Sequence, residues 1–361
     1  MEDILSLTPE ELAAKLKGMG QSAFRAKQLY QWLVRGVDYD GMTNIPRDLR
    51  QKLSEEGPAN PVRILKSVVS KLDGTEKYLY ELQDGNIVEG VTMRYNYGNT
   101  LCVSTQVGCR MGCKFCASTL EGCVRNLTPG ELLGQIIAVN GHLHETDGPD
   151  ARISNVVLMG SGEPLDNYDN VIKFLRLLNR EDGLHMSLRG VSLSTCGLVP
   201  RIYDLANEGL PVTLCISLHA PNDEIRRRTM PIANKYAMDD ILAACRNYID
   251  KTGRRVIFEY ALVSGVNCSR ESAHELAARL RGMQCHVNLI PLNDVPERDL
   301  RAPYEGEMRA FEDELKHLHI SVSRRREMGD DIEGACGQLR RRYLRDNQEE
   351  SETTAEYQDG E

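Results

Sequence analysis

Three cysteines within eight residues, Cys109, Cys113 and Cys116, constrain this chain more than any other feature of its sequence. Thiolates this close together can fold around one metal centre. Their spacing, three residues and then two, differs from the paired cysteines of a zinc finger and from the four-cysteine run of a ferredoxin. A cluster held by three cysteines leaves one iron without a protein ligand, and that iron can bind a substrate. The alternative is a structural zinc site completed by a distant fourth ligand.

Downstream of these cysteines, short apolar segments alternate with helical ones. Strands are predicted at residues 153–159, 190–194, 212–218, 255–262 and 286–290. Helices are predicted at 168–178, 238–248 and 271–281, and another begins at the capping box Thr128-Pro129-Gly130-Glu131. This alternation predicts an α/β fold with parallel strands and outer helices. A closed or partly closed barrel of this kind carries its chemistry at the carboxyl ends of the strands.

The first hundred residues have a different character. Helices are predicted after the capping box Thr8-Pro9-Glu10-Glu11 and at 22–33 and 48–55. Two hairpin signals, Asp73-Gly74 and Asp84-Gly85, lie among predicted strands at 62–69, 77–82, 87–95 and 100–107. We therefore expect a helical domain at 1–57, a strand meander at 58–99 and a barrel at 100–300. A C-terminal extension at 301–345 and a tail at 346–361 would follow.

The charge is unevenly distributed along the chain. The net charge is −9, but the tail holds seven acids and no lysine or arginine, so without it the charge is only −2. The tail is predicted to be disordered. Arginine runs at 226–228, 324–326 and 340–342 suit contact with an RNA backbone, although each run has an alternative interpretation as a solvated face. No membrane-spanning segment or signal peptide is apparent, which predicts a cytoplasmic protein.

A glycine-rich segment, Gly160-Ser161-Gly162-Glu163, follows one of the predicted strands. Two glycines let the backbone approach a ligand closely, and Glu163 could accept a hydrogen bond from an ammonium group. By itself such a segment is more often a turn. His219, likewise, is by itself more often a core histidine than a ligand.

With these segments in view, Cys109-Arg-Met-Gly-Cys113-Lys-Phe-Cys116 resembles the signature of radical S-adenosylmethionine (SAM) enzymes. The resemblance implies a partial (β/α)6 barrel and a 4Fe–4S cluster whose open iron binds the amino and carboxylate groups of SAM. Reduction would then cleave SAM to a 5′-deoxyadenosyl radical. The segments Asn126–Glu131, Leu193-Ser194-Thr195, Ser217–Asn222, Asn288–Asn293 and Gly329–Leu339 are similar to those of the RlmN/Cfr family of rRNA adenine methyltransferases, over nearly all of residues 5–345. By that resemblance, SAM is contacted by Gly162, Glu163, Ser194, Ser217, Leu218, His219 and Asn293.

The family resemblance also assigns roles to three residues outside the motif. Cys336 lies in a segment with Gly329, Gly334 and Gly337, and becomes the acceptor and carrier of the methyl group. Cys102 becomes the thiol that resolves the intermediate, and Glu89 the proton acceptor. Without the resemblance, both thiols have an interpretation as inert packing residues, and Glu89 as an exposed strand carboxylate.

The mechanism implied is a ping-pong reaction that consumes two SAM molecules. Cys336 takes the methyl group of the first SAM. The radical made from the second SAM abstracts hydrogen from the S-methyl group, and the resulting methylene radical adds to adenine. Glu89 removes the ring proton, and Cys102 releases the product by forming a disulfide with Cys336.

The expected product is an adenine methylated at carbon-2 in 23S rRNA, and whether tRNA is a second substrate stays open. A flavodoxin or ferredoxin system is the expected electron donor, and the protein is expected to be a monomer. Methylation at carbon-8 by the same machinery is one alternative. A radical SAM enzyme that only abstracts hydrogen is another, and a zinc-bearing RNA-binding module without catalysis is a third. Cys123 receives no role.

Overall fold

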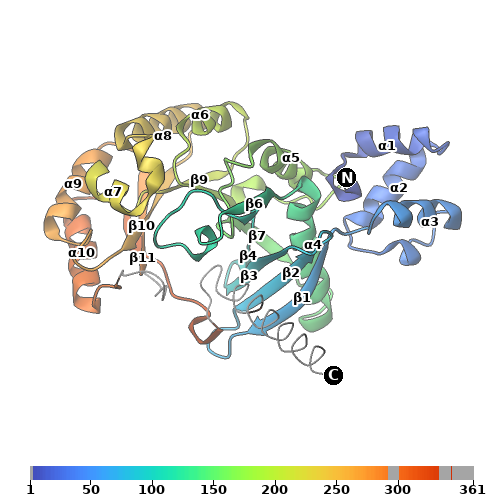
Figure 1. The fold of residues 1–361 in the computed structure, drawn as a ribbon, viewed down its shortest axis with the longest axis horizontal. Coiled ribbons are helices and arrows are strands. Elements are labelled where there is room, and N and C mark those ends of the chain that lie inside the picture. The colour runs from blue at the N-terminus through green and yellow to red at the C-terminus, as the bar shows by residue number, and fades with distance from the viewer. Residues whose placement is uncertain (1–2, 292–300, 333–342, 344–361) are drawn as a thin grey trace, which may run out of the picture.

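The structure is a computed structural model, and it describes residues 3–291, 301–332 and 343. Its centre is one sheet of ten strands in the order β1-β2-β3-β4-β7-β8-β9-β10-β11-β12 (Figure 1). Six strands from β4 to β11 run parallel, and the short β12 extends this parallel part. These strands are β4 (Gly98–Cys102), β7 (Ile153–Leu158), β8 (Val191–Thr195), β9 (Thr213–Ser217), β10 (Val256–Leu262), β11 (Cys285–Pro291) and β12 (Val322–Arg324).

Helices connect the parallel strands and lie on the outside of the sheet (Figure 1). They are α4 (Pro129–Thr146), α5 (Tyr168–Asn179), α6 (Val199–Asn207), α7 (Asp223–Thr229), α8 (Met238–Thr252), α9 (Arg270–Leu280) and α10 (Glu305–His317). The strands carry runs of buried Val, Ile, Leu and Phe, as strands covered by helices require. The predicted partial (β/α)6 barrel is confirmed.

The strand meander continues the barrel sheet and adds antiparallel strands to its edge. Strands β1 (Val62–Val69), β2 (Glu76–Leu82) and β3 (Ile87–Tyr95) form hairpins, and β3 then pairs with β4. The strand expected at 100–107 is two strands instead. β4 ends at Cys102, and β5 (Gln106–Gly108) pairs with β6 (Cys123–Asn126) in a separate sheet. The break arises because the amides of Thr105 and Gln106 turn to the carbonyl oxygen of Ser161.

The N-terminal helices α1 (Pro9–Gly18), α2 (Ala23–Leu33) and α3 (Arg47–Glu56) project from one side of the barrel (Figure 1). Both predicted capping boxes are present, at Thr8 before α1 and at Thr128 before α4. The Asp3 carboxylate joins the two parts of the chain, because it accepts hydrogen bonds from Ser6 and from the Thr128 hydroxyl, the latter at 2.5 Å. Gly130 permits this approach, since a Cβ there would lie 1.7 Å from the carboxylate.

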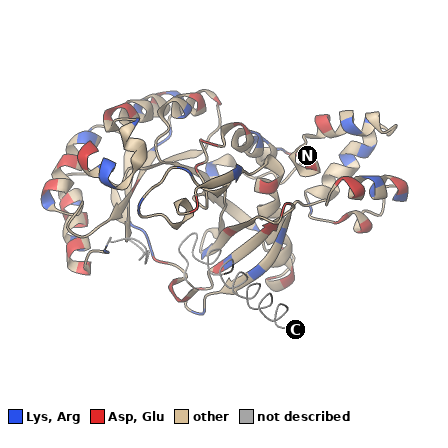
Figure 2. Cartoon of the chain, in the orientation of Figure 1, with Lys and Arg blue, Asp and Glu red and all other residues tan. Residues whose placement is uncertain are grey.

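Charged residues of both signs are interspersed along the N-terminal helices and the outer helices of the barrel (Figure 2). No helix in the described part of the chain is long and apolar enough to cross a membrane.

Candidate active site

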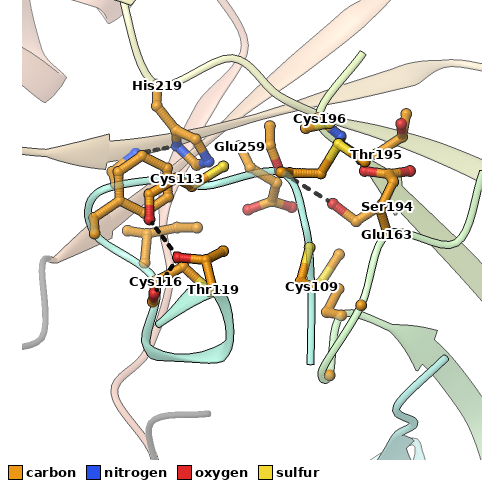
Figure 3. Close-up of a pocket in the computed structure, with 18 of the residues that line it drawn as sticks. Cys109, Cys113, Cys116, Thr119, Glu163, Ser194, Thr195, Cys196, His219 and Glu259 are labelled. Atoms are coloured by element: carbon orange, nitrogen blue, oxygen red, sulfur yellow. Dashed lines mark hydrogen bonds between the residues drawn. The ribbon is translucent and has the colours of Figure 1, made fainter. Parts of the chain in front are cut away.

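The three cysteines of the motif lie in the loop between β5 and β6, at the carboxyl edge of the parallel strands. The amide of Cys109 donates to the Gly122 carbonyl at 2.7 Å, which closes the loop. The Thr119 hydroxyl bridges the carbonyl oxygens of Cys113 and Cys116, at 3.1 and 2.9 Å (Figure 3). The loop therefore has a defined shape that is held by hydrogen bonds among its own residues.

A pocket lies between this loop and the strand ends, and all three cysteines line it (Figure 3). Burial raises the pKa of the Cys109 thiol to about 12, and it also raises the pKa of Cys113. Thiols of this kind bind metal only as they lose their protons, so loading the site releases protons. Burial and access to one pocket are what a cluster held by thiolates needs.

The geometry also bears on which metal centre the pocket fits. Within residues 3–291, 301–332 and 343, no three Cys, His, Asp or Glu side chains are arranged to hold a single metal ion. A multi-iron cluster distributes its cysteine ligands over separate iron atoms, so its thiols need not converge on one point. The cysteine arrangement is compatible with such a cluster.

Glu163 also lines the pocket, in the turn that follows β7. Its two carboxylate oxygens accept hydrogen bonds from the amides of Leu165 and Cys196, at 3.0 and 2.7 Å. Burial raises the pKa of Glu163. Each oxygen has a second lone pair, so the carboxylate retains capacity for a ligand donor. Gly162 makes room for this turn, because a Cβ there would lie 2.7 Å from the backbone nitrogen of Gln106.

Ser194 and Ser217 end two adjacent strands and face each other, with their hydroxyl oxygens 3.4 Å apart. Both hydroxyl-bearing residues line the pocket, as does His219. Leu218 is fully buried and does not line the pocket. Its amide donates to the Glu259 carbonyl at 3.0 Å, so its structural contribution is to the backbone of this turn.

His219 is fixed as a neutral imidazole. Its Nδ1 accepts a hydrogen bond from the Ala261 amide at 2.8 Å, which leaves the proton on Nε2. The ring of Phe115 packs edge-on against it at 4.7 Å. Burial, with a smaller contribution from the positive charge of Arg226, lowers the pKa of His219 to about 3.

This shift predicts an acid-sensitive fold. Between about pH 6.5 and pH 3 the unfolded chain binds a proton at position 219 that the folded chain does not, so stability falls as pH falls. The His219→Asn variant lacks this group, and its free energy of unfolding should be less steep with pH, by up to about 1.4 kcal/mol per pH unit. Urea unfolding of the cluster-free proteins between pH 7 and pH 4 measures both slopes. Equal slopes would contradict the assignment.

Two predicted residues, Glu89 and Cys102, lie outside the pocket lining but on the adjoining sheet surface. Val91 pairs with Cys102 across β3 and β4, and Glu89 is two residues from Val91, so these three side chains share one face. Cys102 packs in a buried cluster that Met159 also contacts, and Met159 lines the pocket. Glu89 forms a buried ion pair with Lys77 at 3.3 Å, so the interpretation of Glu89 as an exposed carboxylate is wrong.

Asn293 and Cys336 lie outside the described residues. The chain on either side of Cys336 is described, however. Asp331 accepts hydrogen bonds from the Ser70 hydroxyl at 2.6 Å and the Lys71 amide at 2.9 Å, at the β1–β2 turn. Tyr343 packs against Leu79 and Ile87 of β2 and β3. The described flanks of the Cys336 segment thus both contact the β1–β3 part of the sheet.

Glu259 in the pocket and Arg226 beside it are among the residues that the sequence did not identify as parts of the site. Glu259 of β10 lines the pocket and accepts a hydrogen bond from Asn288 at 3.0 Å, and burial raises its pKa. An acid within an apolar strand, Val256–Leu262, was the available signal. Arg226 is completely buried, so its assignment to an RNA-contacting basic run is wrong. Its neighbours Arg227 and Arg228 are exposed, as a charge run at the end of a short helix allows.

The chain is similar in sequence and in structure to known proteins. Residues 103–277 match the model of the radical SAM superfamily, and residues 2–57 match that of the ribosomal RNA large subunit methyltransferase N-terminal domain. Two similar proteins are named probable dual-specificity RNA methyltransferase RlmN. The one from Clostridium novyi is 52% identical over 96% of this chain and its own full length, and that from Lachnospira eligens is 53% identical over 96% and 98%. A crystal structure of a radical SAM methyltransferase from Sphaerobacter thermophilus is 42% identical, covers 94% of this chain and 99% of its own, and superposes with a TM-score of 0.89.

Proposed function

Since this chain belongs to the RlmN family of radical SAM RNA methyltransferases, with a 4Fe–4S cluster and SAM as cofactors, we propose that it methylates carbon-2 of an adenine in 23S rRNA. Adenine in tRNA is the proposed second substrate, in keeping with the dual specificity in the names of its relatives. One observation carries the proposal. Three thiols suited to an open cluster share a pocket with Glu163, Ser194, Ser217 and His219, and the sheet face beside it carries Cys102 and Glu89.

Cys109, Cys113 and Cys116 are the proposed cluster ligands. When bound, the cluster supplies the electron that cleaves SAM to the 5′-deoxyadenosyl radical. SAM is proposed to be held by the pocket residues Gly162, Glu163, Ser194, Ser217 and His219, by Leu218 next to the pocket, and by Asn293 outside the described residues. A flavodoxin or ferredoxin system is the proposed electron donor.

Carbon-2 of adenine is not nucleophilic, so it cannot displace the methyl group of SAM directly. Cys336 is proposed to solve this problem as a carrier, because its thiolate can displace the methyl group of a first SAM. The S-methyl group of Cys336 then loses a hydrogen atom to the radical, and its carbon bonds to the adenine ring. This addition leaves one unpaired electron on the adduct, and that electron would return to the oxidised cluster, when bound, as the ring proton departs. The contacts of Asp331 and Tyr343 with the β1–β3 part of the sheet support a carrier that works on this side of the barrel.

Glu89 is proposed to remove the proton from carbon-2. The ammonium of Lys77, which is completely buried, lies 3.3 Å from one oxygen of Glu89 and fixes the position of this carboxylate. The Cys102 thiol, on the same face, is proposed to attack the sulfur of Cys336. That attack forms a disulfide, which an external reductant must open, and releases the methylated RNA.

The Glu89→Gln variant should therefore stall after carbon–carbon bond formation. We expect methylated RNA to fall at least about a hundredfold, as removal of a general base typically causes, and a protein–RNA adduct to accumulate on denaturing gels. Glu81→Gln is the matched control, because Glu81 lies on β2 and pairs with the exposed Arg63. E89Q also removes one member of a buried ion pair and leaves the Lys77 charge unpaired, which lowers stability. The double variant K77M/E89Q removes both charges. If it is inactive as well, loss of the base and not the unpaired charge causes the defect. Wild-type turnover in E89Q would exclude the role.

The N-terminal helices, at 1–57, are proposed to contact the RNA. Their match to the N-terminal domain of rRNA large subunit methyltransferases supports this assignment. The barrel at 100–300 and the extension at 301–345 are proposed to be the other functional units, joined to these helices by the strands at 58–99.

Analysis of the modified RNA tests the proposed function most directly. The holoenzyme is incubated with SAM, a reductant and 23S rRNA or tRNA, and the digested RNA is analysed by mass spectrometry. Chromatographic separation of the carbon-2 and carbon-8 isomers of methyladenosine identifies the position. We expect the carbon-2 isomer; the carbon-8 isomer would overturn the proposed position, and 5′-deoxyadenosine without methylated RNA would overturn the proposed reaction.

A further inference from the structure

Arg226 is a completely buried charged residue beside the active site. Its side chain is 0% exposed, although arginine is almost never buried without a partner. It lies on α7, and it reaches the carboxyl ends of β8 and β9. Its guanidinium donates to the carbonyl oxygens of Cys196 at 2.6 Å, Leu218 at 3.3 Å and Ser217 at 3.4 Å.

These carbonyl oxygens accept hydrogen bonds from the guanidinium of Arg226, but they carry no net charge that could neutralise its positive charge. No carboxylate forms an ion pair with Arg226 among the residues that the structure describes. Its Nη1 has no hydrogen-bond partner there either, although that atom is inaccessible to solvent. Placing an unbalanced cation in a protein interior costs several kcal/mol, so a buried arginine is expected to have an anion nearby.

Cys113, a proposed cluster ligand that becomes anionic when it binds metal, is one of the groups whose charge would act on Arg226. The groups whose negative charge would stabilise the guanidinium are Cys196 and Cys113, with Asp223 contributing less. Cys113 and Cys196 belong to one buried group of side chains that also includes Met230, at the end of the same helix. The amide of Lys114 donates to the Thr229 carbonyl at 2.8 Å, so α7 is attached directly to the cysteine loop.

We propose that Arg226 is a fixed counter-charge for the iron–sulfur cluster, which offsets the negative charge of its thiolates and favours uptake of one electron. The inference rests on the proposed assignment of Cys109, Cys113 and Cys116 as cluster ligands. A cluster with three thiolates is anionic, and each added electron increases that charge. A buried cation lowers the electrostatic cost of this electron because the surrounding dielectric is low.

The test is a reductive titration of the loaded enzyme without SAM, followed by the electron paramagnetic resonance signal of the reduced cluster. A low-potential titanium(III) or europium(II) chelate supplies the electron. In Arg226→Gln and Arg226→Met we expect the ratio of reduced to oxidised cluster to fall at least about tenfold at a given potential, or roughly 59 mV for one electron. Arg226→Lys keeps the charge and should titrate near the wild type. Arg228→Gln is the control, because Arg228 lies on the same helix but is exposed and pairs with Glu224.

The outcomes separate the inference from the function on which it rests. If the wild type loads no iron or sulfide, the cluster assignment itself fails. If the wild type loads and the neutral variants titrate as it does, the counter-charge is excluded. An equal shift in R226K and R226Q would assign the effect to the hydrogen bonds and overturn the role of charge. If neither neutral variant retains a cluster, retention in R226K supports the inference and loss in R226K overturns it. A change in SAM affinity without a change in potential would also overturn it, because Arg226 would then serve the SAM carboxylate.

Discussion

Replacing Cys113 by alanine should abolish both the iron–sulfur absorbance and all methylation of RNA. Cys113 is buried beside Met230 and Cys196, so no solvent ligand can readily take the place of its thiolate. We expect activity below detection, a loss of at least about 10⁴-fold, because the radical that begins the reaction no longer forms. The measurements are the visible spectrum and the iron and sulfide content of protein purified without oxygen.

Cys123→Ala is the matched control for this variant. Cys123 lies at the start of β6, at the end of the same loop, and is half-buried. It should keep both cluster and activity. If wild-type protein held zinc and the zinc were lost in C113A, the site would be a zinc-bearing one and the proposed chemistry would be excluded.

Cys336→Ala should abolish methylation while the cluster and SAM binding remain. The thiol is the proposed acceptor of the first methyl group, and alanine offers no nucleophile in its place. Turnover should fall below detection, as for C113A, but the iron–sulfur absorbance should be that of the wild type. S-methylcysteine at position 336 of the purified wild type, detected by mass spectrometry of peptides, is the accompanying observation. Its absence from enzyme supplied with SAM would contradict the carrier role.

The Cys102→Ala variant distinguishes the two thiols. A resolving thiol acts only after the RNA is bound covalently, so C102A should accumulate the same protein–RNA adduct as E89Q, whereas C336A should form none. Cys285→Ala, on the strand β11, is the control for cysteine loss in general. Free methylated RNA made by C102A at the normal rate would exclude the role.

The parts predicted from the sequence are those encoded by local patterns. The capping boxes at Thr8 and Thr128, the alternation of strands and helices, and the cysteine spacing each depend on residues a few positions apart. The confirmed fold class follows from them. The resemblance then named residues in several separate segments, and five of the seven predicted SAM contacts line one pocket, namely Gly162, Glu163, Ser194, Ser217 and His219.

The parts that could not be predicted depend on contacts between distant segments. Arg226 belongs to a run of three arginines, and nothing local distinguishes the buried one from its exposed neighbours. Lys77 becomes the partner of Glu89 only because β2 and β3 pair in one register. The break between β4 and β5 is set by the Ser161 carbonyl, which lies more than fifty residues further along the chain.

The contacts of Asp331 and Asp73 have a consequence for how the enzyme is made. Asp331 binds Ser70 and Lys71, and Asp73 accepts from the amide of Gly329 at 3.0 Å, across 256 to 261 residues of sequence. The ribosome adds residues from the N-terminus onward. Ser70, Lys71 and Asp73 therefore cannot form these hydrogen bonds until nearly the whole chain has been synthesised. A nascent chain that already contains the whole cysteine loop still lacks the hydrogen bonds of Asp331 and Asp73. The cysteine loop and the described pocket residues up to Pro291 are thus synthesised before the segment that these contacts attach to the sheet.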